Sequence, residues 1–193
     1  PNEGIDPLNV DPLHSFTPRV YHSVAVLLPD GTVLVAGGEE LFDIRNYTGI
    51  RMKKSRHTGE VFRPPYYFQA PKPQVISSPD QGELNSLVDA PERNSQFEIV
   101  LNAPSGAQAG DYIDRVLLMR PGAVTHHFDN DQRYIELDFQ SSNNDLMQTK
   151  VKLTVTAPDE SLAPSGYYLL FVVARSPVTG NRVPSTGHWI RFL

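Results

Sequence analysis

The feature that most constrains the fold of this chain is its division into short apolar runs by proline and glycine. The 193 residues include 17 prolines and 13 glycines, spread along the whole sequence. No segment of helical length carries an apolar stripe at i, i+3, i+4 and i+7, so the sequence predicts an all-β chain. We expect strands over residues 23–28, 32–36, 59–62, 74–77, 96–101, 113–120, 133–139, 150–156, 166–174 and 187–192.

The stretch RPPYYFQAPKPQV, which begins at Arg63, predicts a boundary between two domains. Its prolines cannot donate to a strand ladder, and they stiffen the chain into linker geometry. About seven strands follow over roughly 120 residues, which is the size and spacing of an immunoglobulin-like sandwich. The few strands before the boundary carry little core, and they suit one blade of a propeller. We therefore expect one domain over residues 1–70 and another over 71–193.

Composition excludes several classes of partner and site. The formal net charge of −5 argues against nucleic acid, because phosphate binding favours a basic face. No apolar run approaches the roughly 20 residues that span a bilayer, so no membrane partner is expected. The chain contains no cysteine, which removes disulfides, thiolate metal sites and cysteine nucleophiles.

A charged segment, EELFDIRNYTGIRMKKSRH, covers residues 39–57. Four basic residues cluster in its second half, which is compatible with a binding patch. We favour an exposed loop insertion, because charged segments of this kind are most often solvated connections.

Three histidine-bearing stretches are candidates for chemistry. Tyr21 and His22 are adjacent at the head of an expected strand, where neighbouring side chains point to opposite faces and at most one can fill a given core. His126 lies in VTHHFDNDQR, after another expected strand. His188 precedes Trp189, the only tryptophan, and we expect Trp189 in the sandwich core and His188 outward.

Each of these stretches also has a structural interpretation, because a lone strand histidine is usually a satisfied core or surface residue. The combination of phenol and imidazole is more informative, since copper favours nitrogen and oxygen donors in tetragonal geometry. A tyrosine and a histidine on consecutive residues, with an imidazole from a distant turn, could supply three such donors. Spacing alone does not decide between the two interpretations.

Four stretches of this sequence occur here in the order seen in one family of copper-radical enzymes. They are RVYHSVAVLLPDGTVLVAGG, EVFRPPYYF, VTHHFDNDQR and SGYYLLFVVARSPVTGNRVPSTGHWIRF. Over most of its length the chain resembles the C-terminal part of the galactose oxidase and glyoxal oxidase family. The resemblance implies the end of a kelch-type β-propeller followed by an early-set immunoglobulin-like sandwich.

The same resemblance implies a copper site and assigns residues to it. Carried over by motif, Tyr21 is the axial tyrosine and the base that takes the substrate's proton. His22 and His126 are the equatorial ligands, and His127 is not implied. The family's reaction oxidises a primary alcohol or an aldehyde with dioxygen and yields hydrogen peroxide.

The family's fourth ligand is a tyrosine cross-linked to a cysteine, which stores the radical. This chain has no cysteine and cannot form that group. The resemblance therefore implies a partner, the N-terminal propeller portion of the same protein, and we expect this chain alone to lack oxidase activity. The resemblance also implies that the complete protein is secreted.

Two non-catalytic functions remain open at this stage. The chain could be a carbohydrate-binding module, in which Tyr66, Tyr67 or Tyr112 stacks on sugar rings, although we favour a packing role for Tyr66 and Tyr67 at the domain junction. Alternatively, it could brace a propeller, whose incomplete form would expose sheet edges. Convergence of Tyr21, His22 and His126 in the fold would favour a metal site instead.

Overall fold

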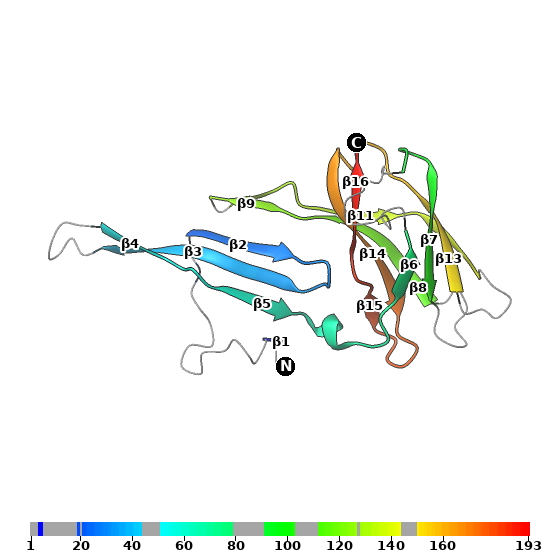
Figure 1. Cartoon of the computed structure of the whole chain (residues 1–193), viewed down its shortest axis with the longest axis horizontal. Helices are drawn as coiled ribbons and strands as arrows, with labels where there is room; N and C mark the ends of the chain where they lie inside the picture. Colours follow the sequence, from blue (N-terminus) through cyan, green and yellow to red (C-terminus); the bar gives the residue numbers. More distant parts are fainter. Residues whose placement is uncertain are drawn as a thin grey trace.

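The computed structural model describes residues 4–5, 19, 21–43, 51–78, 91–102, 112–126, 128–143 and 150–193. For residues 4–5, 40–43, 51–54 and 143 it describes the backbone alone. Within these ranges the regular structure is almost entirely β, as the sequence predicts, and none of the described segments is a helix with the length and apolarity to cross a membrane. A flat sheet forms one end of the molecule and a sandwich the other (Figure 1).

The first sheet has five strands, with the order β1-β5-β3-β2 and with β4 paired to the far part of β3. Its Thr32 is buried at the turn that joins β2 to β3, where Asp30 accepts hydrogen bonds from the Thr32 amide and hydroxyl. The strands are β1 (Gly4–Ile5), β2 (Tyr21–Leu27), β3 (Val33–Asp43), β4 (Arg51–Ser55) and β5 (Gly59–Arg63).

Strand β3 is longer than the sequence predicts, because it changes neighbours halfway. Residues 33–36 pair with β5 and residues 39–43 pair with β4. The expectation of a loop insertion over 39–57 is therefore wrong for its two ends, which form the β3–β4 ladder. The part from 44 to 50 lies outside the described residues.

The sandwich consists of two sheets, of order β11-β8-β14-β15 with β16 on β14, and β12-β13-β7-β6. Between them, alternate residues of β7, β8, β13 and β14 form a core that contains the fully buried Tyr168 and Phe192. A 3-10 helix, η2 (Pro65–Phe68), connects the first sheet to the sandwich. The sandwich strands are β6 (Gln74–Ser77), β7 (Gln96–Asn102), β8 (Ile113–Arg120), β11 (Arg133–Leu137), β12 (Phe139–Asn143), β13 (Lys150–Thr156), β14 (Gly166–Arg175), β15 (Arg182–Pro184) and β16 (His188–Phe192).

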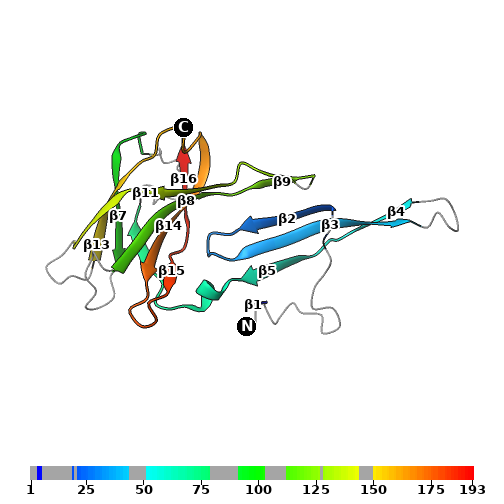
Figure 2. The ribbon, with the colours of Figure 1, turned by 180° about the vertical axis from the view of Figure 1, so that it is seen from behind.

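Between β8 and β11 the chain forms a separate hairpin, β9 (Ala123–Thr125) and β10 (Phe128–Asn130). In both views this hairpin extends from the sandwich and runs beside β2 of the first sheet (Figures 1 and 2). A residue at the hairpin tip therefore lies close to the first sheet, although it belongs to the second half of the chain.

The first sheet packs on the outer face of β14. A second apolar cluster there contains Phe171 and Val173 from β14, and Leu27 from β2 packs against it. The Tyr66 hydroxyl donates to the Gly31 carbonyl at 2.7 Å, and the Gly187 amide donates to the Pro29 carbonyl at 2.6 Å. Every residue of β14 from 168 to 174 is consequently buried, on both faces of the sheet.

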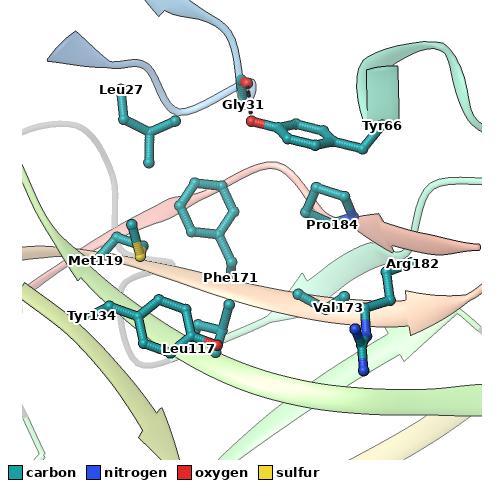
Figure 3. A pocket seen from close by; sticks show the side chains of 10 residues that line it. All are labelled: Leu27, Gly31, Tyr66, Leu117, Met119, Tyr134, Phe171, Val173, Arg182 and Pro184. Atoms are coloured by element: carbon teal, nitrogen blue, oxygen red, sulfur yellow. Dashed lines mark hydrogen bonds between the residues drawn. The ribbon is translucent and has the colours of Figure 1, made fainter. Parts of the chain in front are cut away.

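A mainly apolar pocket of about 250 Å³ lies in this junction (Figure 3). The phenol ring of Tyr66 covers one side of it, and the ring of Phe171 projects into it from β14. Tyr66 thus lies at the junction between the sheet and the sandwich, as we expected. Tyr67 instead lies under the Lys72 ammonium, 4.1 Å from the ring centroid.

Two expectations about aromatic residues are wrong. Trp189 is 41% exposed, whereas Ile190 and Phe192 of the same strand fill the core, so alternation places His188 on the core side and Trp189 outward. The register explains this result, because Trp189 pairs with Leu169, which belongs to the outer cluster. Tyr112 is only 4% exposed and therefore offers no surface for a sugar ring.

A buried carboxylate ties the edge of the sandwich together. Asp114 on β8 accepts hydrogen bonds from Arg182 at 2.7 Å and from Arg115 at 3.1 Å, and Arg175 forms a third ion pair with it. Burial raises the pKa of the Asp114 carboxyl, but the arginine hydrogen bonds and charges lower it by more, so this pKa lies below its usual value.

We predict that Gly187→Ala destabilises the junction. A Cβ at this position would lie 2.6 Å from the Phe171 ring, so the ring or the strand must move. The expected loss in the free energy of unfolding is about 1–3 kcal/mol, measured by urea denaturation. The matched control is Gly59→Ala, whose Cβ would make contacts no shorter than 3.4 Å, and which should stay within about 0.5 kcal/mol of the parent. Equal behaviour of the two variants would contradict this packing.

We predict that Asp114→Asn lowers stability by about 2 kcal/mol at pH 7, because a charged acceptor is lost from among three arginines. The folded pKa of this carboxyl lies below the unfolded value of about 3.9. Its stabilisation is therefore present above that value and is lost as the pH falls through the folded pKa. The difference between parent and variant should shrink below about pH 4. The exposed Asp138→Asn is the control, and a difference that does not depend on pH would refute the assignment.

Candidate metal centre

The backbone at His22 departs from a regular strand and turns its side chain. His22 has φ of 60°, in the left-handed region that costs a non-glycine residue about 1–3 kcal/mol. In a regular strand the side chains of Tyr21 and His22 would lie on opposite faces. Here their ring centroids are only 3.8 Å apart, so the two side chains share one side of the sheet.

Two glycines on the neighbouring strand accommodate this conformation. Gly37 and Gly38 have φ of 70° and 108°, and a Cβ on Gly37 would lie 2.9 Å from the His22 carbonyl oxygen. They also lie where β3 exchanges β5 for β4 as its neighbour, and the Arg56 amide donates to the Gly38 carbonyl there. The consecutive glycines of the sequence thus have a local structural reason.

Arg19 holds this irregular point together. Its side chain is 4% exposed and forms an ion pair with Glu60 at 3.2 Å. It also donates to the carbonyls of Gly37 at 2.8 Å and Thr58 at 2.7 Å. The Arg19 guanidinium therefore links the segment before β2 to β3 and to the residues between β4 and β5. These contacts lie next to the left-handed backbone of His22.

His126 reaches the same place from the sandwich. It is the first residue of the two-residue loop between β9 and β10, and its φ of 50° suits a tight hairpin turn, which uses left-handed positions. Its Nδ1 lies 2.7 Å from the Thr125 hydroxyl. His127 lies outside the described residues.

The three residues singled out from the sequence come together. The His126 ring centroid lies 5.0 Å from that of His22 and 5.8 Å from that of Tyr21. Two of these residues come from the first sheet and the third from the sandwich hairpin, along the contact of β2 with β9 visible in Figures 1 and 2. The cluster is open to solvent, since the His22 side chain is 39% exposed and His126 is exposed.

This arrangement brings together one phenol ring and two imidazole rings, with centroids 3.8, 5.0 and 5.8 Å apart. Such donors suit a tetragonal metal such as Cu(II). Among the described residues, no group of three His, Cys, Asp or Glu side chains is placed to hold a metal ion, so the phenol of Tyr21 is needed as a third donor. The apolar pocket of the junction has a separate lining, which includes none of the three cluster residues.

Sequence reasoning missed one residue beside the cluster. Glu39 lies opposite Tyr21 in the β2–β3 register, and its Oε2 is 3.5 Å from His22 Nδ1. Its place could have been found by pairing the two strands across the Pro29-Asp30-Gly31 turn. The sequence alone could not have shown the backbone conformation of His22, which brings its ring toward Glu39. The other described histidines, His57 and His188, are not members of the cluster.

Comparison with known proteins gives a consistent picture. The family model described as galactose oxidase-like, early set domain, matches residues 76–192, more than half of the chain. The chain is 29% identical over 186 residues to the aldehyde oxidase GLOX1 of Arabidopsis thaliana and 28% identical over 184 residues to the aldehyde oxidase GLOX of Vitis pseudoreticulata. It is 26% identical over 175 residues to a galactose oxidase of Gibberella zeae.

These alignments are unequal in coverage. They include 93, 91 and 90% of this chain, but only 27, 30 and 21% of the respective relatives. The chain therefore spans less than a third of the length of the proteins that it matches.

We predict that Arg19→Met destabilises the first sheet and disturbs the ring cluster. It leaves the Glu60 carboxylate and two carbonyls without their donor, which should lower the free energy of unfolding by about 2–3 kcal/mol. The double variant Arg19→Met/Glu60→Gln should recover part of the loss, since it removes the unpaired charge. Denaturant unfolding measures the stability, and nuclear Overhauser effects between the Tyr21 and His126 rings measure the cluster. Unchanged stability of the single variant would contradict the role of Arg19.

Proposed function

The chain belongs to the galactose oxidase-like family, and from this premise we propose that it is the C-terminal portion of a secreted, copper-dependent oxidase. In this proposal it supplies three of the four protein ligands, Tyr21, His22 and His126. The observation that carries the proposal is the convergence of these three rings from two separate sheets. Its substrate class is a primary alcohol or an aldehyde, in keeping with the names of the relatives.

The residues present fit a copper ion. A phenol and two imidazoles form a nitrogen and oxygen donor set of the kind that Cu(II) favours. The left-handed backbone at His22, which lies within a strand, supports the same interpretation, because strained conformations of non-glycine residues concentrate at functional sites. When bound, copper would accept one of the two electrons removed from the substrate, and the radical of the family's cross-linked tyrosine, which this chain cannot form, would accept the other.

Within this site the residues have distinct roles. His22 and His126 would each offer one ring nitrogen and hold the ion between the first sheet and the hairpin. The Tyr21 phenolate oxygen would accept the hydroxyl proton of an alcohol, which makes Tyr21 the general base. Exposure of the cluster leaves room for substrate and for the remaining ligand.

The proposal requires a second part of the protein. A cysteine is needed for the family's cross-linked tyrosine, and this chain has none. The missing part is the N-terminal portion of a kelch-type propeller, of which the first sheet would be the last segment. Within the described residues β3 is the only ladder partner of β2, and the β9–β10 hairpin of the sandwich runs beside β2.

We predict that the 193-residue chain binds one Cu(II), measured by isothermal titration calorimetry, and that His22→Ala and His126→Ala each weaken binding at least tenfold. Tyr21→Phe should weaken binding less and should remove the phenolate-to-copper absorption. His57→Ala is the matched control, because His57 is exposed and lies outside the cluster. With copper and alcohol, the isolated chain should form no peroxide. Binding that none of the three substitutions affects would overturn the proposed site.

A further inference from the structure

The two histidines of the cluster engage the protein through the same ring atom. His22 directs Nδ1 toward Glu39, with Oε2 at 3.5 Å, and His126 directs Nδ1 toward the Thr125 hydroxyl at 2.7 Å. In each ring the other nitrogen, Nε2, is thus the atom left for a ligand. Partners of this kind fix the ring orientation and the tautomer of metal-binding histidines.

The two partners differ in how strictly they select the tautomer. An ionised carboxylate can only accept a hydrogen bond, so contact with Glu39 favours the proton on Nδ1 of His22 and the lone pair on Nε2. A hydroxyl can either donate or accept, so Thr125 orients the His126 ring without imposing one tautomer. Glu39 is therefore the more selective of the two.

The position of Glu39 follows from the fold. It is paired with Tyr21 across the β2–β3 ladder, and its side chain is 21% exposed. The left-handed φ of His22 brings the imidazole to the side of the sheet that carries Tyr21. Oε2 of Glu39 lies 3.5 Å from Nδ1 of His22, and a small rotation of the His22 ring would close this gap to the roughly 2.7–3.2 Å of a hydrogen bond.

We propose that Glu39 is a positioning residue of the copper site, which orients His22 through Nδ1 so that Nε2 faces the metal. Thr125 acts in the same way on His126. The inference rests on the proposed function, because it concerns the same three ligands. It goes further in assigning to Glu39, which is not itself a ligand, the orientation of one ligand ring.

The test measures Cu(II) affinity and the electron paramagnetic resonance spectrum of the 193-residue chain and its variants. Glu39→Ala removes the acceptor and should weaken Cu(II) binding by roughly 10–100-fold. Glu39→Gln keeps an acceptor oxygen but removes the charge, so a smaller loss of a few fold is expected. Both variants should alter the nitrogen hyperfine couplings, which a merely structural role would leave unchanged.

The control is Glu160→Gln, which alters an exposed glutamate of the sandwich half and should change neither quantity. Thr125→Val should weaken binding, and Thr125→Ser, which keeps the hydroxyl, should restore it. Thermal unfolding of each apo variant separates loss of the site from loss of the fold.

The outcomes distinguish the two proposals. If His22→Ala weakens Cu(II) binding but Glu39→Ala leaves both affinity and spectrum unchanged, the positioning role is wrong and the copper site stands. If the parent chain shows no Cu(II) binding that His22→Ala reduces, the proposed function fails, and the role of Glu39 fails with it.

Discussion

The candidate site depends on the packing of the first sheet against the outer face of β14. Tyr21 and His22 belong to one sheet and His126 to a hairpin of the sandwich, so their separation depends on how the two parts pack, at this junction and where β9 runs beside β2. Burial of apolar surface around Phe171 stabilises the junction through the hydrophobic effect, which has no directional preference. The hydrogen bond from Tyr66 to the Gly31 carbonyl gives the junction a defined orientation. The continuous burial of β14 is the consequence, since a strand covered on both faces carries apolar residues without alternation.

The local backbone conformation orients the two histidine rings within the cluster. Left-handed conformations at His22 and His126 are unfavourable in isolation, and each is held by its surroundings. The left-handed conformation of His22 is accommodated by the conformational freedom of Gly37 and stabilised by the buried guanidinium of Arg19. The left-handed conformation of His126 is stabilised by the pairing of β9 with β10.

Much of the fold could be predicted because the strands of the sandwich core have clear periodicity. Residues 96–99 and 150–156 alternate between apolar and polar, and both segments lie in strands with alternating burial. Trp189 shows the limit of this reasoning, because hydrophobicity alone could not tell that Leu169 opposite it belongs to the outer cluster. The members of the candidate site were found by motif. Their convergence depends on long-range packing and on one backbone angle at His22, neither of which a single sequence displays.

The central claim is that one tyrosine and two histidines from separate sheets bind one copper ion. Pulsed electron paramagnetic resonance of the Cu(II)-loaded 193-residue chain tests it most directly, because the remote ring nitrogen of each coordinated imidazole gives a distinct modulation. The account predicts modulation from two equatorial imidazoles, one of which disappears in His22→Ala and the other in His126→Ala. Modulation from a single imidazole, or from two that both survive these substitutions, would contradict it.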